Sequence, residues 1–145
     1  MHAPRTPTQT IVLLMGSVLL VVGFLALVFG STDFHTGRDI TTQTFIIWRA
    51  NGWDCVIWML LGAAGILASA RYDAARTYAM AAGAFLIVVA IWGFVDGHHV
   101  FGLMGVDTTD NVSHAVLGVL GVAASLIPAP SRSRAPFGSG HPSGA

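Results

Sequence analysis

The chain has 145 residues, 54% of them hydrophobic and 10% charged, which is far below the roughly 25% of charged residues in soluble domains. This composition excludes an ordinary water-soluble globule and predicts one integral membrane domain. The formal net charge is zero, so the chain has no excess positive charge that would attract nucleic acid, and we expect no nucleic-acid partner. The single cysteine, Cys55, excludes an internal disulfide, a CxxC redox pair and a cysteine-rich metal cage.

Four apolar segments approach the length of about 20 residues that a helix needs to cross a bilayer. The expected spans are residues 11–30, 53–70, 77–95 and 112–129, which together form a transmembrane domain over 11–129. We therefore expect an all-α fold, an integral membrane four-helix bundle made of two tandem helical hairpins. The first span has no A-x-A site after it and is longer than a usual signal sequence, so we expect it to be retained.

The arginines predict the orientation, because cytoplasmic loops carry an excess of positive charge. One side of the spans holds Arg5, Arg71, Arg76, Arg132 and Arg134, and the other holds Arg38 and Arg49. We expect a plasma-membrane protein whose ends, residues 1–10 and 130–145, are both cytoplasmic. The second end is rich in Pro, Gly and Ser and is expected to be disordered. The loops at about 31–45 and 96–110 then face outside.

A weak internal repeat relates the two halves of the chain. A shift of 67 positions pairs Gly16 with Gly83, and Gly23 with Ala90. A shift of 60 positions pairs the start of the second span with the start of the fourth. That shift matches Asn51 with Asn111, and Asp54 with His114. Small residues that recur on one helix face let helices approach closely in lipid. We therefore expect helix packing at Gly16, Gly23, Gly83, Gly118 and Gly121.

Two stretches carry a resemblance to a known family. They are NVSHAVLGVLGVAAS at 111–125 and NGWDCVIWMLLGAAG at 51–65. Both open on an Asn-x-x-titratable pattern and continue as a glycine-spaced apolar run. The chain resembles, over residues 11–127, the small actinobacterial four-helix membrane proteins catalogued as a domain of unknown function. It departs from a symmetric histidine pair because Asp54 stands where a second histidine would be expected. The resemblance implies the four-helix fold and brings no activity with it.

The polar residues at the span starts have a structural interpretation. Asn51 and Asn111 occupy plausible N-cap positions, and Asp54 falls in a first turn, where the helix dipole favours a carboxylate. His114 is disfavoured there as a cation, so we expect it to be neutral and hydrogen-bonded to the neighbouring hairpin. An intramembrane ionisable residue is also a functional candidate, and that alternative stays open for His114.

The outer loops contain the chain's possible metal ligands. His98, His99 and Asp96 lie close together in sequence, and His114 follows at the next helix start. Imidazoles with carboxylates can bind zinc, but no HxxxH or HExxH spacing places them on one face. A haem held by His99 and His114 is a further alternative. We expect no metal, no cofactor and no catalytic residues.

Two classes of function remain. The first is a non-enzymatic accessory or interaction module, with the lipid bilayer and a second copy or a larger membrane complex as its partners. The second is a small transport or ligand-binding protein that uses the outer Asp and His loops. A proton-coupled exporter would need a carboxylate near the middle of a span, and no span has one. No nucleotide-binding loop and no nucleophile–base pair can be placed, so we expect a protein that is not an enzyme.

Overall fold

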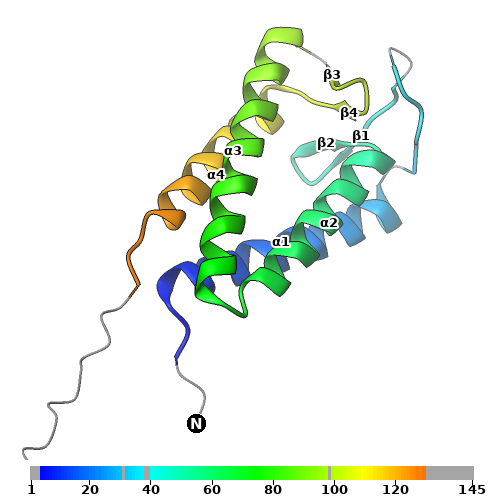
Figure 1. Cartoon of the computed structure of the whole chain (residues 1–145). Helices are drawn as coiled ribbons and strands as arrows, with labels where there is room; N and C mark the ends of the chain where they lie inside the picture. The colour runs from blue at the N-terminus through cyan, green and yellow to red at the C-terminus, as the bar shows by residue number, and fades with distance from the viewer. Residues whose placement is uncertain (1–3, 31, 38–39, 98, 130–145) are drawn as a thin grey trace, which may run out of the picture.

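A computed structural model describes residues 4–30, 32–37, 40–97 and 99–129 of the chain. Four helices account for most of this part (Figure 1). They are α1 (Pro7–Phe29), α2 (Gly52–Ala68), α3 (Tyr72–Asp96) and α4 (Thr108–Ser125). Four short strands lie between them: β1 (Gln43–Phe45), β2 (Trp48–Ala50), β3 (His99–Val100) and β4 (Met104–Gly105). The expected tail at 130–145 lies outside the described residues.

The two long apolar helices begin earlier than their hydropathy indicates. α1 starts at Pro7, because Thr6 is its N-cap and forms a capping box with Gln9. Pro7 is suited to the first helical position, where its missing N–H is not needed. α3 starts at Tyr72, so Arg76 lies inside that helix and not in a turn before it. α3 ends at Asp96, and its C-cap Gly97 has a left-handed φ of 86°, which an L-residue adopts at a cost.

Glycines bring the helices of each hairpin into backbone contact. In the first hairpin, a Cβ atom at Gly16 would lie 2.8 Å from the Gly62 carbonyl oxygen of α2. In the second, a Cβ atom at Gly83 would lie 2.7 Å from the Gly118 carbonyl oxygen of α4. Larger residues at these sites would force the helices apart. The small-residue faces are therefore occupied inside the molecule, α1 against α2 and α3 against α4.

Each of the two segments that join the helices of a pair contains a short β-hairpin, which the all-α expectation did not include. β1 pairs antiparallel with β2, and Phe45 lies opposite Trp48. β3 pairs antiparallel with β4, and Val100 lies opposite Met104. The fold is mostly helical, with two small two-stranded sheets at one end.

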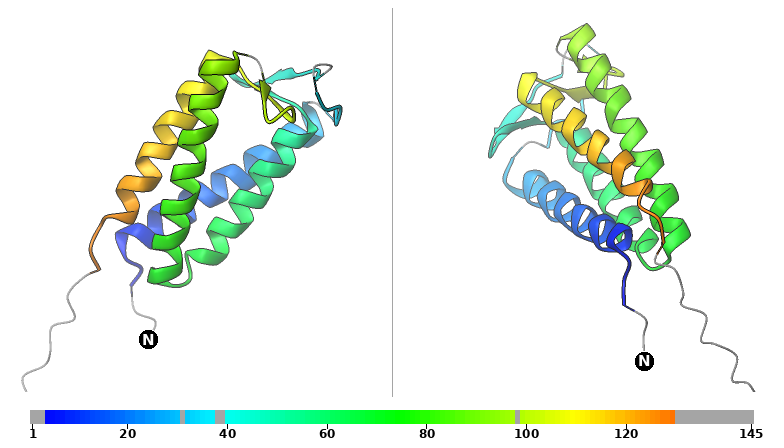
Figure 2. Two further views of the ribbon diagram at one scale, coloured as in Figure 1. Left: turned by 45° about the horizontal axis from the view of Figure 1, so that its top comes forward. Right: turned by 90° about the vertical axis from the view of Figure 1, so that its left-hand side faces the viewer.

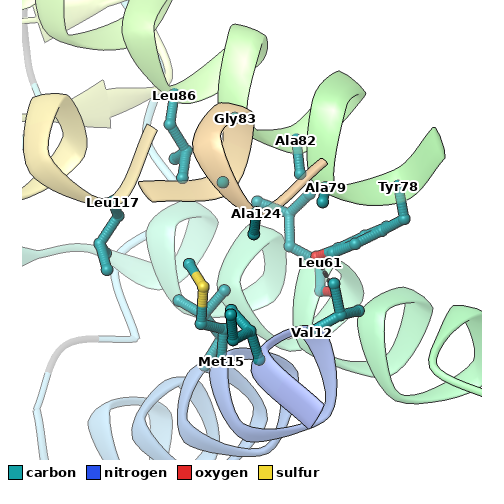
Figure 3. A pocket seen from close by; sticks show the side chains of 13 residues that line it. Val12, Met15, Leu61, Tyr78, Ala79, Ala82, Gly83, Leu86, Leu117 and Ala124 are labelled. Atoms are coloured by element: carbon teal, nitrogen blue, oxygen red, sulfur yellow. Dashed lines mark hydrogen bonds between the residues drawn. The ribbon is translucent and has the colours of Figure 1, made fainter. Parts of the chain in front are cut away.

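The two helical hairpins lie close together at the end that holds the N-terminus and separate towards the other end (Figure 2). At the close end, the Thr8 hydroxyl donates to the Ala124 carbonyl at 3.0 Å, and the Tyr78 hydroxyl donates to the Leu61 carbonyl at 2.6 Å. Small side chains such as Ala79 fill the contact beside Tyr78 (Figure 3). At the open end, the two β-hairpins lie between the helical pairs.

The structure supports the internal repeat but corrects half of its register. α1 and α3 correspond at the expected shift of 67, since Gly16 and Gly83 make equivalent contacts. α2 and α4 correspond at a shift of 56 and not 60, because Gly16 meets Gly62 as Gly83 meets Gly118. At this shift the helix N-caps, Asn51 and Asp107, are also equivalent.

Candidate functional site: the polar layer beneath the β-hairpins

Asn51 and Asp54 cap the start of α2, because the side chain of each accepts a hydrogen bond from the main-chain N–H of the other. The Asn51 side chain accepts from the Asp54 N–H at 2.9 Å, and the Asp54 carboxylate accepts from the Asn51 N–H at 2.9 Å. Both side chains are buried. This reciprocal pair is a capping box, and it satisfies N–H groups that the first helical turn leaves without an intrahelical partner.

Asp107 and Asp110 do the same for α4, so the N-cap position expected for Asn111 belongs to Asp107. The Asp107 carboxylate accepts from the Asp110 N–H, and the Asp110 carboxylate accepts from the Asp107 N–H, both at 3.0 Å. Asn111 lies one residue further on, inside the helix and buried. α4 begins earlier than its apolar run because an aspartate pair, and not an asparagine, starts it.

Each capping aspartate also binds the β-hairpin of the other half of the chain. The Asp110 carboxylate accepts from the Arg49 N–H of β2 at 3.2 Å. The Asp54 carboxylate has a second main-chain donor in Gly105 of β4. Arg49 and Gly105 occupy equivalent positions at the shift of 56, as do Asp110 and Asp54, so the internal repeat relates the two contacts to each other. The two halves are thereby held together at the open end, and the Asn51 amide adds a bond to the Leu103 carbonyl at 2.7 Å.

Asn111 and His114 lie one turn apart on α4, and both are buried. Asn111 Oδ1 and His114 Nδ1 have no hydrogen-bond partner among the described residues. Asn111 packs against α3 where Gly93 leaves room, since a Cβ atom at Gly93 would collide with the Asn111 amide. A buried polar atom without a partner has a free-energy cost of about 1–3 kcal/mol. The hydrogen bond expected between His114 and the other hairpin is not made through Nδ1.

The residues considered as metal ligands lie in separate elements. Asp96 ends α3 and is exposed, and His99 begins β3. His114 is inside α4, and His98 lies outside the described residues. In the part of the chain that the structure describes, no group of three or more His, Cys or Asp side chains is arranged to hold a metal ion.

In the loop between α1 and β1, the carboxylate of Asp33 is held by its neighbours. The Asp33 carboxylate accepts hydrogen bonds from the Thr41 hydroxyl and main chain and contacts the His35 ring. These bonds, led by the Thr41 hydroxyl, hold the pKa of Asp33 well below its usual value of 3.8. Asp33 therefore organises its own loop as a carboxylate.

A family model described as "Domain of unknown function (DUF4383)" matches residues 9–127. The chain belongs to this family. The matched range contains both capping boxes, both β-hairpins and nearly all of the four helices, so the DUF4383 domain is the folded part described above. No curated protein and no solved structure matches the chain.

The family description names no activity. The chemistry of the polar layer, by which we mean Asn51, Asp54, Asp107 and Asp110, is therefore argued from its geometry. The sequence interpretation identified the Asn51–Asp54 cap but missed Asp107 and Asp110. A signal for them exists, because Asp107-Thr-Thr-Asp110 has the same four-residue spacing as Asn51-Gly-Trp-Asp54. The links to Arg49 and Gly105 could not be found this way, since they depend on hairpins from the opposite half.

Proposed function

We propose that this DUF4383 protein crosses the cell membrane four times and serves as a non-enzymatic accessory module of a membrane assembly. The observation that carries the proposal is the large apolar surface that the helices leave exposed. In the most apolar 18-residue stretch of α1, 22% of the residues are buried, and in that of α3, 33%. The core helix of a soluble protein would be mostly buried.

The exposed apolar side chains occur on all four helices. They include Leu14 and Val21 on α1, Leu60 and Leu67 on α2, Val88 and Val95 on α3, and Val116 and Val119 on α4. Soluble monomers rarely expose continuous apolar patches above a few hundred Å². A surface of this kind on every helix fits a lipid environment.

Helix length and charge placement support the same proposal. α1 and α3 have 23 and 25 residues, or about 34 and 37 Å of helix, against a hydrocarbon core of about 30 Å. α2 and α4 are shorter, with 17 and 18 residues, and each follows directly on a β-hairpin. Charged residues of the described chain fall at the two ends of the bundle. Arg5, Arg71 and Arg76 mark the end that we assign to the cytoplasm.

The polar layer favours a structural role over catalysis. The Asp54 and Asp110 carboxylates already accept main-chain N–H groups from their own helix and from the opposite hairpin. A general acid or base must instead be free to reach a substrate proton. The glycine faces are occupied within each hairpin, so a second copy or a larger complex would bind through the exposed apolar faces.

Photo-crosslinking tests both parts of this proposal. A benzophenone amino acid would replace exposed Leu60 or Val95, with buried Val89 as the matched control. We expect the protein to stay in the membrane pellet after alkaline carbonate extraction, and the exposed positions to yield one protein adduct of defined mass. Release by carbonate would contradict the membrane location. Adducts to lipid alone at both exposed positions would contradict the accessory role and leave the membrane location standing.

A further inference from the structure

A cavity of about 300 Å³ lies between the two helical hairpins, next to β2. All four helices contribute to its wall, and Trp48 of β2 and Trp58 of α2 line it as an edge-to-face pair with ring centroids 6.4 Å apart. This volume is at the lower end of the range of small-molecule sites. The lining is mainly apolar, and Ser113 and His114 of α4 are its polar members apart from the indoles of Trp48 and Trp58.

The cavity exists because the two halves of the repeat differ here. Val18 of α1 lines it where the shift of 67 places Phe85 in the other half, and Ser113 lines it where the shift of 56 places Ile57. At the repeat-related place on the opposite side of the molecule, Phe85 of α3 and Ile57 of α2 pack against a buried cluster around Val89 and Met104. Smaller side chains thus leave open on one side the space that larger ones fill on the other.

Four leucines close the cavity towards the end that holds the N-terminus. They are Leu19, Leu61, Leu86 and Leu117, one from each helix and equivalent in pairs under the repeat. The same four leucines also line a second, much smaller cavity of about 20 Å³ (Figure 3), which has room for about one water molecule. Val18 is 60% exposed on the outside of the bundle. A ligand would therefore enter from the side, past Val18.

The polar groups of the cavity define which ligand it suits. Ser113 Oγ accepts from the Trp48 indole N–H at 3.0 Å, and its own hydroxyl proton has no acceptor among the described residues. A neutral imidazole also has one N–H to donate. His114 Nδ1 is fully buried and has no partner within the described chain, so Nε2 is the ring nitrogen through which His114 would donate into the cavity. Two donors side by side call for an acceptor. The described lining contains no Asp or Arg, so nothing there would balance a charged ligand.

We propose that this cavity binds an uncharged, lipid-soluble ring compound with a carbonyl group, the carbonyl oxygen facing Ser113 and His114 and the ring lying against Trp48 and Trp58. Entry from the bilayer rests on the proposed membrane location, whereas binding in detergent does not. The site is separate from the Asp and His residues of the outer loops.

Tryptophan quenching by menadione, an uncharged bicyclic dicarbonyl, tests the proposal on the full chain in detergent. Trp53→Phe and Trp92→Phe leave Trp48 and Trp58 as the fluorophores, so the signal comes from the cavity. The double variant V18F/S113I fills the cavity with a phenylalanine and with the isoleucine of the other half. V21F is the matched control, because Val21 is exposed on the same helix and does not line the cavity.

We expect saturable quenching in the parent and in V21F, and an affinity at least about tenfold weaker in V18F/S113I. Should that variant fail to fold, V18F alone and H114L carry the test. H114L should weaken menadione binding about three- to tenfold, the value of one hydrogen bond. It should leave competition by 2-methylnaphthalene, which has no carbonyl, unchanged. Quenching that is non-saturable, or equal in V18F/S113I and V21F, would overturn the proposal.

Discussion

Asp54 and Asp110 each join two parts of the molecule with one carboxylate. Each carboxylate accepts an N–H from the N-cap residue of its own helix and another from the β-hairpin of the opposite half. A buried carboxylate needs such donors, since its desolvation is otherwise costly. The same residues therefore fix both the starting points of α2 and α4 and the position of the hairpins above them.

Replacement of either aspartate by alanine should destabilise the protein. D54A and D110A would each leave an N-cap N–H and a hairpin N–H without an acceptor, so we expect a loss of about 1–3 kcal/mol in the free energy of unfolding. D96A is the control, because Asp96 is exposed at the end of α3, and it should change stability by less than about 0.5 kcal/mol. Unfolding in mixed detergent micelles gives the three values. Equal stability of D96A, D54A and D110A would show that the reciprocal links contribute nothing.

At the scale of elements, the sequence predicted four helices and the start of α2, but it placed the starts of α1, α3 and α4 too late. Apolar content marks the middle of a helix, whereas caps set its ends. Thr6 therefore extends α1 back to Pro7, and Asp107 extends α4 back to Thr108. The β-hairpins were missed because strands of two or three residues have no readable alternation.

The register of the repeat shows how matched polar residues can mislead. A shift of 60 aligned two asparagines, but Asn51 caps a helix and Asn111 packs inside one. The glycine spacing gives 56 directly, since Gly62 and Gly65 become Gly118 and Gly121. Glycines are the better guide because each contact between helix backbones needs one at that place. The cavity could not be predicted, since it depends on which side chains of the two halves face each other.

Replacement of glycine by alanine should destabilise the protein to different extents at Gly62 and at Gly118. A Cβ atom at Gly62 would meet main-chain atoms of α1, including the Gly16 carbonyl oxygen at 2.6 Å, and a backbone cannot move aside cheaply. At Gly118 the nearest atom is the Ile87 side-chain atom Cγ1 at 2.7 Å, and the nearest main-chain atom is the Gly83 carbonyl oxygen at 2.9 Å, compared with 2.4 Å for the Leu20 nitrogen at Gly62. We therefore expect G62A to cost about 1–3 kcal/mol and G118A less.

Leu60→Ala, at a side chain that is 65% exposed, is the control for both glycine variants, because it shortens a side chain on α2 without touching a packed helix face. Thermal unfolding, monitored by size-exclusion chromatography, ranks the three variants by stability. A G118A variant less stable than G62A would contradict the packing described for the two hairpins.

At the scale of the whole molecule, two similar helical hairpins are joined at one end by small side chains and at the other by exchanged contacts of the β-hairpins. Both Arg71, before α3, and Arg5, before α1, lie at the first end, and the strands lie at the second. An arrangement with its polar groups at two ends and apolar helices between them fits the proposal that the protein spans a bilayer. The central claim is that the strands face outside and the chain ends face the cytoplasm.

Single-cysteine labelling in intact cells tests this claim most directly. Cysteines would replace exposed Thr36 in the first outer loop, exposed Asp73 at the start of α3, and exposed Val88 in the middle of α3, in a C55S background. We predict that a membrane-impermeant maleimide labels T36C in intact cells, labels D73C only after permeabilisation, and labels V88C in neither case. Labelling of D73C in intact cells at the rate of T36C would contradict the orientation, and ready labelling of V88C would contradict the membrane-spanning fold.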